Sequence, residues 1–334
     1  MRGGRLPADV KKASALRRIP SFPALRYVKA RATEGQVCAF KLATQSSPIV
    51  VEDTFGRAMT LAPGDLFLGT TGYRESTRWV VGGTPKGGLV PGHQYWVLSE
   101  CGVVGNLVAD TPMSKTFVGQ ARYLGAVVGE ERQPLRLSDF AVQRASRSAD
   151  RKAPLYIIAG TSAEVGKTTA GIAVLRTLLD QGYRTVVVLK ATGTSAITEI
   201  AIYKDYGAAQ VFDSVDFGLP TTYGPSPKIM ARFFDRAIDT CLAVPADAFL
   251  VECGGDLFGA NVPIFLKRLK RRRARAKVVF AAADAVGAWG GTQMLRKLGW
   301  PVSLLTGPCT DTPTLEKRTE KLCRTPAMNM TRDD

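Results

Sequence analysis

The chain has 334 residues, of which 45% are hydrophobic and 22% charged, and it carries a formal net charge of +16 at pH 7. This length accommodates two domains of ordinary size, and no apolar run approaches the roughly 20 residues that span a bilayer, so the sequence predicts no integral membrane protein. The six cysteines form no Cys-x-x-Cys pair, which argues against a zinc knuckle or a dense disulfide framework and favours a reducing, cytoplasmic compartment.

Much of the positive charge lies in two clusters, residues 2–31 and 267–277. A basic run after a helix is more typical of a solvated face, or of a patch that steers an anionic metabolite, than of a specific nucleic-acid site. Neither cluster is accompanied by a recognised RNA- or DNA-binding motif. A small anionic metabolite is therefore the favoured partner, and nucleic acid is not.

The chain is predicted to begin with a flexible basic lead-in, residues 1–26, followed by a β-rich domain, residues 27–137. The lead-in lacks the apolar core of a secretory signal. Three prolines interrupt any long amphipathic helix, and an organellar transit peptide is the alternative interpretation of this basic, acid-poor segment. Short β-prone runs separated by glycine and proline indicate the β-rich domain. These runs are residues 37–42, 49–51, 66–69, 79–82, 95–98 and 123–128.

Within this domain, residues 72–78 place two arginines, an acid and two hydroxyls in one loop. Arg74 and Arg78 are candidate contacts for an anionic substrate, and a solvated turn with internal ion pairs is the alternative. His93 is the only histidine, so a histidine-based metal site is not expected.

A polar linker, residues 138–153, leads to an apolar run that breaks into a glycine-bounded loop and re-emerges as a helix. Such a strand, loop and helix typically bind phosphate, because backbone N–H groups and the helix N-terminus face the anion. Lys167 is expected to reach the β- and γ-phosphates, and Thr168 to offer its hydroxyl to Mg²⁺. The predicted nucleotide-binding residues are Gly160, Thr161, Ser162, Ala163, Glu164, Val165, Gly166, Lys167, Thr168 and Thr169.

Strands and helices alternate after the loop. Helices are predicted near residues 167–181, 196–206, 228–242, 261–273 and 292–298, and strands at 185–189, 248–251, 278–281 and 302–305. This alternation predicts an α/β domain over residues 154–325, with a doubly wound, mostly parallel sheet and helices on both faces, followed by a tail, 326–334. Ligands of such sheets bind at the carboxyl ends of the strands.

Charged side chains follow several of these strands. Lys190 follows the second strand, and Glu252 follows the strand at 248–251, where a buried acid needs a cation or hydrogen-bond donors. Asp213 and Asp216 supply further carboxylates, and the sequence does not decide which of the two is linked to a metal.

The segment Gly-Thr-x-x-x-Val-Gly-Lys-Thr at 160–168 resembles the loop of dethiobiotin synthetase and its relatives, a P-loop branch that includes the amidotransferases of cobyrinic acid synthesis. The resemblance extends to Lys190 and to the segment Val-Glu-Cys-Gly-Gly that contains Glu252, and it does not reach the β-rich domain. It implies that Lys190 contacts phosphate or a substrate carboxylate, and that Glu252 lies near Mg²⁺ and the nucleotide.

The resemblance also implies that one aspartate, Asp213 or Asp216, binds the metal together with Thr168 and Glu252, and that Lys167, Lys190 and Glu252 are the catalytic residues. Two departures concern the substrate. Ser162 stands where the family usually has aspartate, and Cys253 replaces a glycine beside Gly254 and Gly255, which makes residues 253–255 candidate substrate contacts. The same loop position holds no second lysine, which argues against the partitioning and septum-site ATPases.

The first functional hypothesis is an ATP- and Mg²⁺-dependent enzyme, of ligase or phosphoryl-transfer type, that activates a small anionic metabolite. The second is a nucleotide-dependent switch, metallochaperone or cofactor-assembly accessory protein, and the third is a nucleic-acid-associated ATPase. ATP is favoured because the Asn-Lys-x-Asp motif of GTPases is absent, Thr306-Gly307-Pro308 following the last predicted strand. A homo-oligomer is compatible with the sequence.

Overall fold

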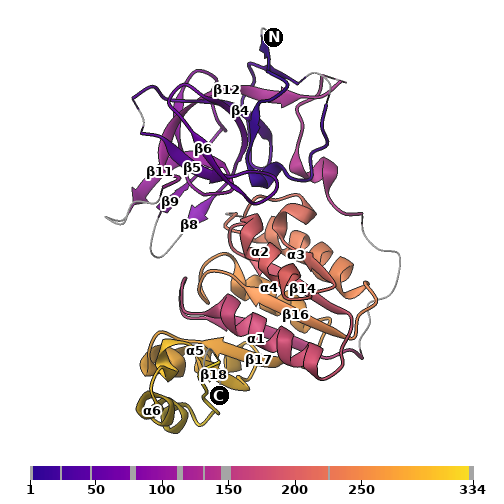
Figure 1. The fold of residues 1–334 in the computed structure, drawn as a ribbon, viewed down its shortest axis with the longest axis vertical. Helices are drawn as coiled ribbons and strands as arrows, with labels where there is room; N and C mark the ends of the chain where they lie inside the picture. Colours follow the sequence, from indigo (N-terminus) through magenta and orange to yellow (C-terminus); the bar gives the residue numbers. More distant parts are fainter. Residues whose placement is uncertain are drawn as a thin grey trace. The chain divides into compact units, whose positions relative to one another are not determined.

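The computed structural model describes residues 3–22, 25–45, 47–75, 80–110, 116–130, 132–143, 152–224 and 226–330. The chain forms two compact units (Figure 1). Unit 1 comprises residues 1–142 together with two later segments, 194–198 and 214–224, and unit 2 comprises residues 143–193, 199–213 and 225–334. The sequence did not predict that two segments from the second half of the chain would belong to the first unit.

Unit 1 is β-rich, as expected. Its main sheet has the order β1-β3-β12-β4-β7-β11-β9-β8, with β10 pairing with β11 and β12, and β2 with β7. The strands of this sheet are β1 (Gly3–Arg5), β2 (Lys11–Lys12), β3 (Arg26–Val28), β4 (Val37–Leu42), β7 (Leu66–Thr71), β8 (Arg74–Glu75), β9 (Val80–Gly83), β10 (Gln94–Val97), β11 (Val103–Asp110) and β12 (Gly119–Val128). Strands β5 (Ile49–Glu52) and β6 (Ala58–Leu61) form a separate pair.

Cross-strand aromatic pairs occupy the centre of unit 1. Phe40 of β4 lies opposite Phe67 of β7 and Tyr123 of β12 in the strand register. The ring of Phe40 has its centroid 5.4 Å from that of Phe67 and 5.6 Å from that of Tyr123, and all three side chains are fully buried. Such pairs stabilise a sheet because neighbouring side chains on one face pack against each other.

The first residues of unit 1 correct the prediction of a flexible lead-in. Residues 3–22 contain β1, β2 and a short 3-10 helix, η1 (Ser14–Leu16), and the side chains of Leu6, Val10 and Leu16 are buried in the core. The backbone N–H of Ala13 donates to the carbonyl of Leu68, which ties the segment to β7. The many charged residues of this segment make its composition similar to that of a flexible region. Its apolar side chains are nevertheless spaced so that they enter the core.

Unit 2 is the predicted α/β domain. Its sheet is fully parallel, with the order β15-β14-β16-β13-β17-β18. The strands are β13 (Leu155–Gly160), β14 (Val186–Thr192), β15 (Gln210–Phe212), β16 (Ala248–Cys253), β17 (Lys277–Ala281) and β18 (Leu304–Thr306). The helices are α1 (Lys167–Asp180), α2 (Ile197–Asp205), α3 (Pro227–Leu242), α4 (Val262–Lys270), α5 (Ala285–Lys297) and α6 (Pro313–Cys323), and α6 packs against α5.

Alternating side chains divide the core of unit 2 between the two faces of the sheet. Ile158 and Val188 pack with Val174 and Leu178 of α1 in one buried cluster. Phe234 of α3 and Phe265 of α4 make an edge-to-face contact with ring centroids 5.3 Å apart. The central strands are buried on both faces, which explains why they are near-continuous apolar runs.

The ends of the predicted domain differ from the structure. The predicted tail begins at residue 326, yet Leu305 of β18 donates to the carbonyl of Pro326 and accepts from the N–H of Met328, so this stretch runs beside the sheet. Strand β15 was not predicted, and α5 begins at Ala285 rather than near residue 292. Of the predicted linker, residues 138–140 lie in the 3-10 helix η2 (Leu137–Phe140) of unit 1, and residues 144–151 lie outside the described residues.

All six cysteines are buried and none forms a disulfide, in agreement with their scattered positions. Over the ranges that the structure describes, no helix combines the length and the apolar character needed to cross a membrane.

Candidate phosphate-binding site

The predicted phosphate-binding loop joins the end of β13 to the start of α1 in unit 2. Gly166 caps α1 with φ at 86°, a left-handed conformation that glycine adopts without strain. Gly160 ends β13, and a Cβ there would lie 2.8–2.9 Å from Val165 Cγ2, the carbonyl oxygen of Ala281 and Lys167 Cγ. The two glycines are therefore required by the path of the loop, and the sequence from Gly160 to Thr169 has the local structure that was predicted.

Lys167 lies in the first turn of α1 and is 7% exposed. Its ammonium donates to the carbonyl oxygen of Ser162 at 2.5 Å, which keeps the side chain at the loop. Burial lowers the pKa of Lys167, Glu252 opposes this change, and the charge of Lys190 adds to it. A phosphate at the loop would replace the carbonyl partner by a charged one and restore the pKa of the ammonium.

Glu252 is the acid at the centre of the site. It lies in β16 and is 1% exposed. The Thr168 hydroxyl donates to its Oε1 at 3.1 Å, and the Tyr203 hydroxyl donates to its Oε2 at 2.5 Å. Burial and the neighbouring carboxylate raise the pKa of Tyr203, so its phenol stays protonated and remains a donor.

Lys190 of β14 lies beside Glu252 because the two residues are paired in the register of β14 and β16. Its ammonium is 3.5 Å from Glu252 Oε1 and also forms an ion pair with Glu199 of α2. Burial alone would lower the pKa of Lys190, but the charges of Glu199 and Glu252 outweigh it and the pKa is raised. The structure thus brings together the three predicted catalytic residues, Lys167, Lys190 and Glu252.

The two candidate metal-linked aspartates have different surroundings. Asp213 is 1% exposed, belongs to unit 2, and its charge contributes to the raised pKa of Lys190. Asp216 belongs to unit 1, where its Oδ1 is 3.2 Å from Arg18 Nη1 and its Oδ2 is 3.6 Å from Arg17 Nη2. Asp213 therefore acts on Lys190, whereas Asp216 pairs with the two arginines.

The predicted substrate contacts belong to both units. Cys253 of β16 lies close enough to Glu252 and Lys167 for their charges to act on its thiol. Arg74 is buried in unit 1, where its guanidinium is 2.8 Å from Glu100 and 5.2 Å from the ring centroid of Phe117. Arg78 lies outside the described residues. Burial raises the pKa of the Cys253 thiol to about 12, so the thiol is neutral at physiological pH.

Gly254 and Gly255 follow Cys253 in a tight turn. A Cβ on Gly254 would lie 2.3 Å from the carbonyl oxygen of Thr192, and Gly255 has φ at 81°. The Thr192 hydroxyl donates to the carbonyl of Gly254 at 2.9 Å. The two glycines therefore have a backbone role at the end of β16, in addition to any role toward a substrate.

No protein-family model and no curated protein matches the chain. Among solved structures, it is similar to chloroplast FtsY from Physcomitrella patens, with 15% identity and a TM-score of 0.38 over 57% of this chain and 62% of that one. It is also similar to the cell division protein FtsY from Thermotoga maritima, with 17% identity and a TM-score of 0.39 over 57% and 66% of the two chains. A third structure is the signal recognition particle 54 kDa protein from Aeropyrum pernix in complex with GDP, with 15% identity and a TM-score of 0.38 over 58% and 46%.

The chain spans about three-fifths of the length of the first of these structures. The P-loop fold of unit 2 is evident from its own sheet, loop and helix, whereas the dethiobiotin synthetase branch stays a prediction.

Two residues of the site were missed by the sequence analysis, Glu199 and Tyr203. They lie four positions apart on α2, where side chains at i and i+4 share one face of the helix. Glu199 pairs with Lys190 and Tyr203 with Glu252. An acid and a phenol at this spacing, in a helix that directly follows Lys190, were the signal that could have found them.

The oxygen atoms of Thr168 and Glu252 fit a magnesium ion. They lie 3.1 Å apart at the loop and are hard ligands of the kind that Mg²⁺ prefers. Among the described residues, no group of three or more His, Cys, Asp or Glu side chains could enclose a metal.

Proposed function

We propose that the protein is a Mg²⁺- and nucleotide-dependent P-loop NTPase that works as a switch. One observation supports a switch in particular. The chain segments that follow Lys190 and Asp213, residues 194–198 and 214–224, belong by their contacts to unit 1. A displacement of Lys190 or Asp213 on nucleotide binding or hydrolysis would therefore be passed along the chain into the β-rich unit.

Each of these segments is held in unit 1 by specific hydrogen bonds. The buried carboxylate of Glu52 accepts from the backbone N–H groups of Ile197, at 2.9 Å, and Thr198, at 3.3 Å. The hydroxyl of Thr221 donates to the carbonyl of Tyr73 at 2.8 Å. Because both segments are anchored rather than solvated, their movement would change contacts inside unit 1.

The residues of the loop would bind the nucleotide phosphates, with Lys167 and Lys190 placing positive charge against their oxygens. Thr168 and Glu252 would hold Mg²⁺, which, when bound, neutralises charge on the β- and γ-phosphates. Tyr203 keeps Glu252 in position through its hydrogen bond to Oε2. ATP is the nucleotide we expect, and GTP is the alternative to be tested beside it.

Two of the candidate acceptor contacts give little support to a metabolite ligase. Arg74 is engaged with Glu100 and Phe117, and Cys253 is 2% exposed with a neutral thiol. A ligase would still be identified by its kinetics, since a small carboxylate would accelerate its nucleotide turnover.

The switch is tested by amide hydrogen exchange on the full chain, with and without a non-hydrolysable ATP or GTP analogue and Mg²⁺. We expect the analogue to alter exchange in residues 194–198 and 214–224 of the wild type and to leave the Lys167→Ala variant unchanged. Lys297→Ala, an exposed substitution on α5, is the matched control.

Three results would overturn parts of this proposal. Absence of analogue binding to the wild type would remove the NTPase. Tight binding without any change in the two segments would remove the switch. Turnover stimulated by one compound from a pool of small carboxylates would restore the ligase.

A further inference from the structure

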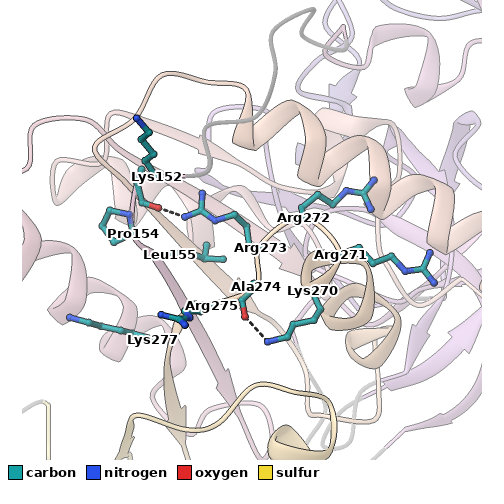
Figure 2. Close-up of a pocket in the computed structure, with 12 residues that line it drawn as sticks. Lys152, Pro154, Leu155, Lys270, Arg271, Arg272, Arg273, Ala274, Arg275 and Lys277 are labelled. Atoms are coloured by element: carbon teal, nitrogen blue, oxygen red, sulfur yellow. Dashed lines mark hydrogen bonds between the residues drawn. The ribbon is translucent and has the colours of Figure 1, made fainter.

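A cavity of about 660 Å³ lies at the opposite end of the sheet of unit 2 (Figure 2). It is formed by two short segments, residues 152–155 and 270–277. Leu155 is the first residue of β13, and Lys277 is the first residue of β17. The cavity is therefore at the amino ends of the strands whose carboxyl ends meet the phosphate loop.

The lining of this cavity is strongly basic. Seven of its twelve residues are lysine or arginine, and none is acidic. Its volume falls within the range of about 300–1,000 Å³ that is usual for small-molecule sites. A concave surface with charges of one sign concentrates their field and attracts ions of the opposite sign.

Two of these cations lie against neutral groups. The ammonium of Lys277 is 5.4 Å from the ring centroid of Tyr156, and that of Lys270 is 4.3 Å from the ring centroid of Trp300. The ammonium of Lys270 donates to the carbonyl oxygens of Ala274, at 2.7 Å, and Gly299, at 2.6 Å. Carbonyl oxygens and rings orient a cation without cancelling its charge.

Arg272 differs from its neighbours, because it pairs with Asp235 and Asp239 of α3. By contrast, no carboxylate in the described part of the chain lies within ion-pair distance of Lys270, Arg271, Arg275 or Lys277. The cavity thus collects positive charge that the described carboxylates do not neutralise.

A nucleotide at the phosphate loop would not supply the missing negative charge. Strand β13 has six residues, and at about 3.3 Å per residue it separates the loop from the cavity by about 20 Å. We infer that this cavity is a second anion site of unit 2, which binds a small phosphorylated anion with two or more charges. Arginine and lysine in one pocket match phosphate oxygens by bidentate and point-charge contacts.

A small anion fits the cavity better than a nucleic acid does. The cations come from two short segments around one cavity. A protein that binds a nucleic acid backbone instead presents a longer positively charged groove that runs along the backbone. Several phosphates on one small molecule would meet Arg275 and Lys277 together, and these two side chains lie close to each other in Figure 2.

The site is tested by calorimetric titration of inorganic tripolyphosphate into the full chain carrying Lys167→Ala, which weakens binding at the phosphate loop. We expect one site at low salt, and about a tenfold loss of affinity when Arg275→Gln and Lys277→Gln are added. Lys317→Gln with Arg318→Gln, two exposed cations of α6, is the matched control and should change the affinity less than twofold. Circular dichroism verifies the fold of each variant.

A second measurement needs no substitution. Acetylation of lysines in the wild type, read by mass spectrometry, should slow at Lys277 when tripolyphosphate is present, independently of any protection at Lys167. Equal loss of affinity in the control variant, absence of binding, or absence of protection at Lys277 would overturn the inference. A single-stranded RNA that binds more tightly than tripolyphosphate and loses affinity with Arg275→Gln and Lys277→Gln would overturn the assignment to a small anion.

Discussion

The two ends of the parallel sheet in unit 2 both carry clustered lysines or arginines, but they hold them differently. At the carboxyl ends of the strands, Lys167 and Lys190 are buried beside the carboxylates of Glu252 and Glu199. At the amino ends, Arg272 pairs with Asp235 and Asp239, and the other cations of residues 270–277 lie against carbonyl oxygens and rings, or are exposed. The cations of the first site face carboxylates, whereas Lys270, Arg271, Arg275 and Lys277 at the second have no described carboxylate within ion-pair distance.

This difference follows from burial. A buried lysine is stable only with a charged or hydrogen-bonded partner, whereas an exposed one keeps its water. Removing a charge from the carboxyl ends should therefore leave a buried partner uncompensated, at a large cost. Removing one from the amino ends should relieve repulsion, with a small gain that salt screens.

The largest effect is expected for Glu252→Gln. The substitution removes the charge that faces both Lys190 and Lys167, and loss of one partner of a buried pair costs about 3 kcal/mol of the free energy of unfolding. Chemical denaturation at neutral pH measures this, and Glu320→Gln on the exposed face of α6 is the control. If Glu252→Gln lost no more stability than Glu320→Gln, the charge of Glu252 would not be coupled to those of Lys190 and Lys167.

A smaller loss, about 2 kcal/mol, is expected for Lys190→Gln, because Glu252 keeps its bonds from Thr168 and Tyr203. The loss should depend on pH in one direction. The pKa of Lys190 is raised above its ordinary value of 10.5, so the charged lysine stabilises the fold fully below that pH and this stability is lost as pH rises further. The difference between wild type and variant should be constant from about pH 6 to 9 and shrink at higher pH. A difference that instead grows at alkaline pH contradicts the ion-pair assignment.

Gly171→Ala should cost about 1–2 kcal/mol, although this change usually stabilises a helix by about 1 kcal/mol. A Cβ at Gly171 of α1 would lie 2.0 Å from the hydroxyl oxygen of Tyr203, whose side chain is fully buried. The phenol would have to leave Glu252. Tyr203→Phe alone should cost about 1 kcal/mol, and the double variant should lose less than the sum, because the clash and the hydrogen bond share one atom. Additive losses would show that the clash is relieved elsewhere.

The phosphate loop and the parallel sheet could be predicted because both are local. Gly160, Gly166, Lys167 and Thr168 are required by backbone geometry and by phosphate chemistry within nine residues. Even the placement of Lys190 and Glu252 at strand ends followed from the runs of apolar residues before them. Their pairing could not be predicted, because it depends on β14 and β16 being neighbours across 62 positions of sequence.

The surroundings of the two aspartates and the place of the lead-in depend on contacts between residues far apart in the sequence, which local composition does not indicate. Asp213 and Asp216 differ by three positions, yet one belongs to unit 2 and the other pairs with Arg17 and Arg18 near the start of the chain. The basic lead-in was interpreted from its charges and prolines, whereas its place in unit 1 is decided by the buried side chains of Leu6, Val10 and Leu16. The membership of residues 194–198 and 214–224 in unit 1 likewise has no local signal.

The smallest effect concerns the amino ends of the strands. Arg275→Gln with Lys277→Gln should raise the free energy of unfolding by about 0.5 kcal/mol at 20 mM salt, because neighbouring cations of residues 270–277 no longer repel each other. At 500 mM salt the gain should vanish, since the Debye length then falls below about 5 Å. The pair Lys317→Gln and Arg318→Gln on α6, where Glu316 and Glu320 are nearby in sequence, should show no such gain. If Arg275→Gln with Lys277→Gln instead lowered the free energy of unfolding at low salt, negative groups would be neutralising these cations. The two ends of the sheet would then not differ in the way described.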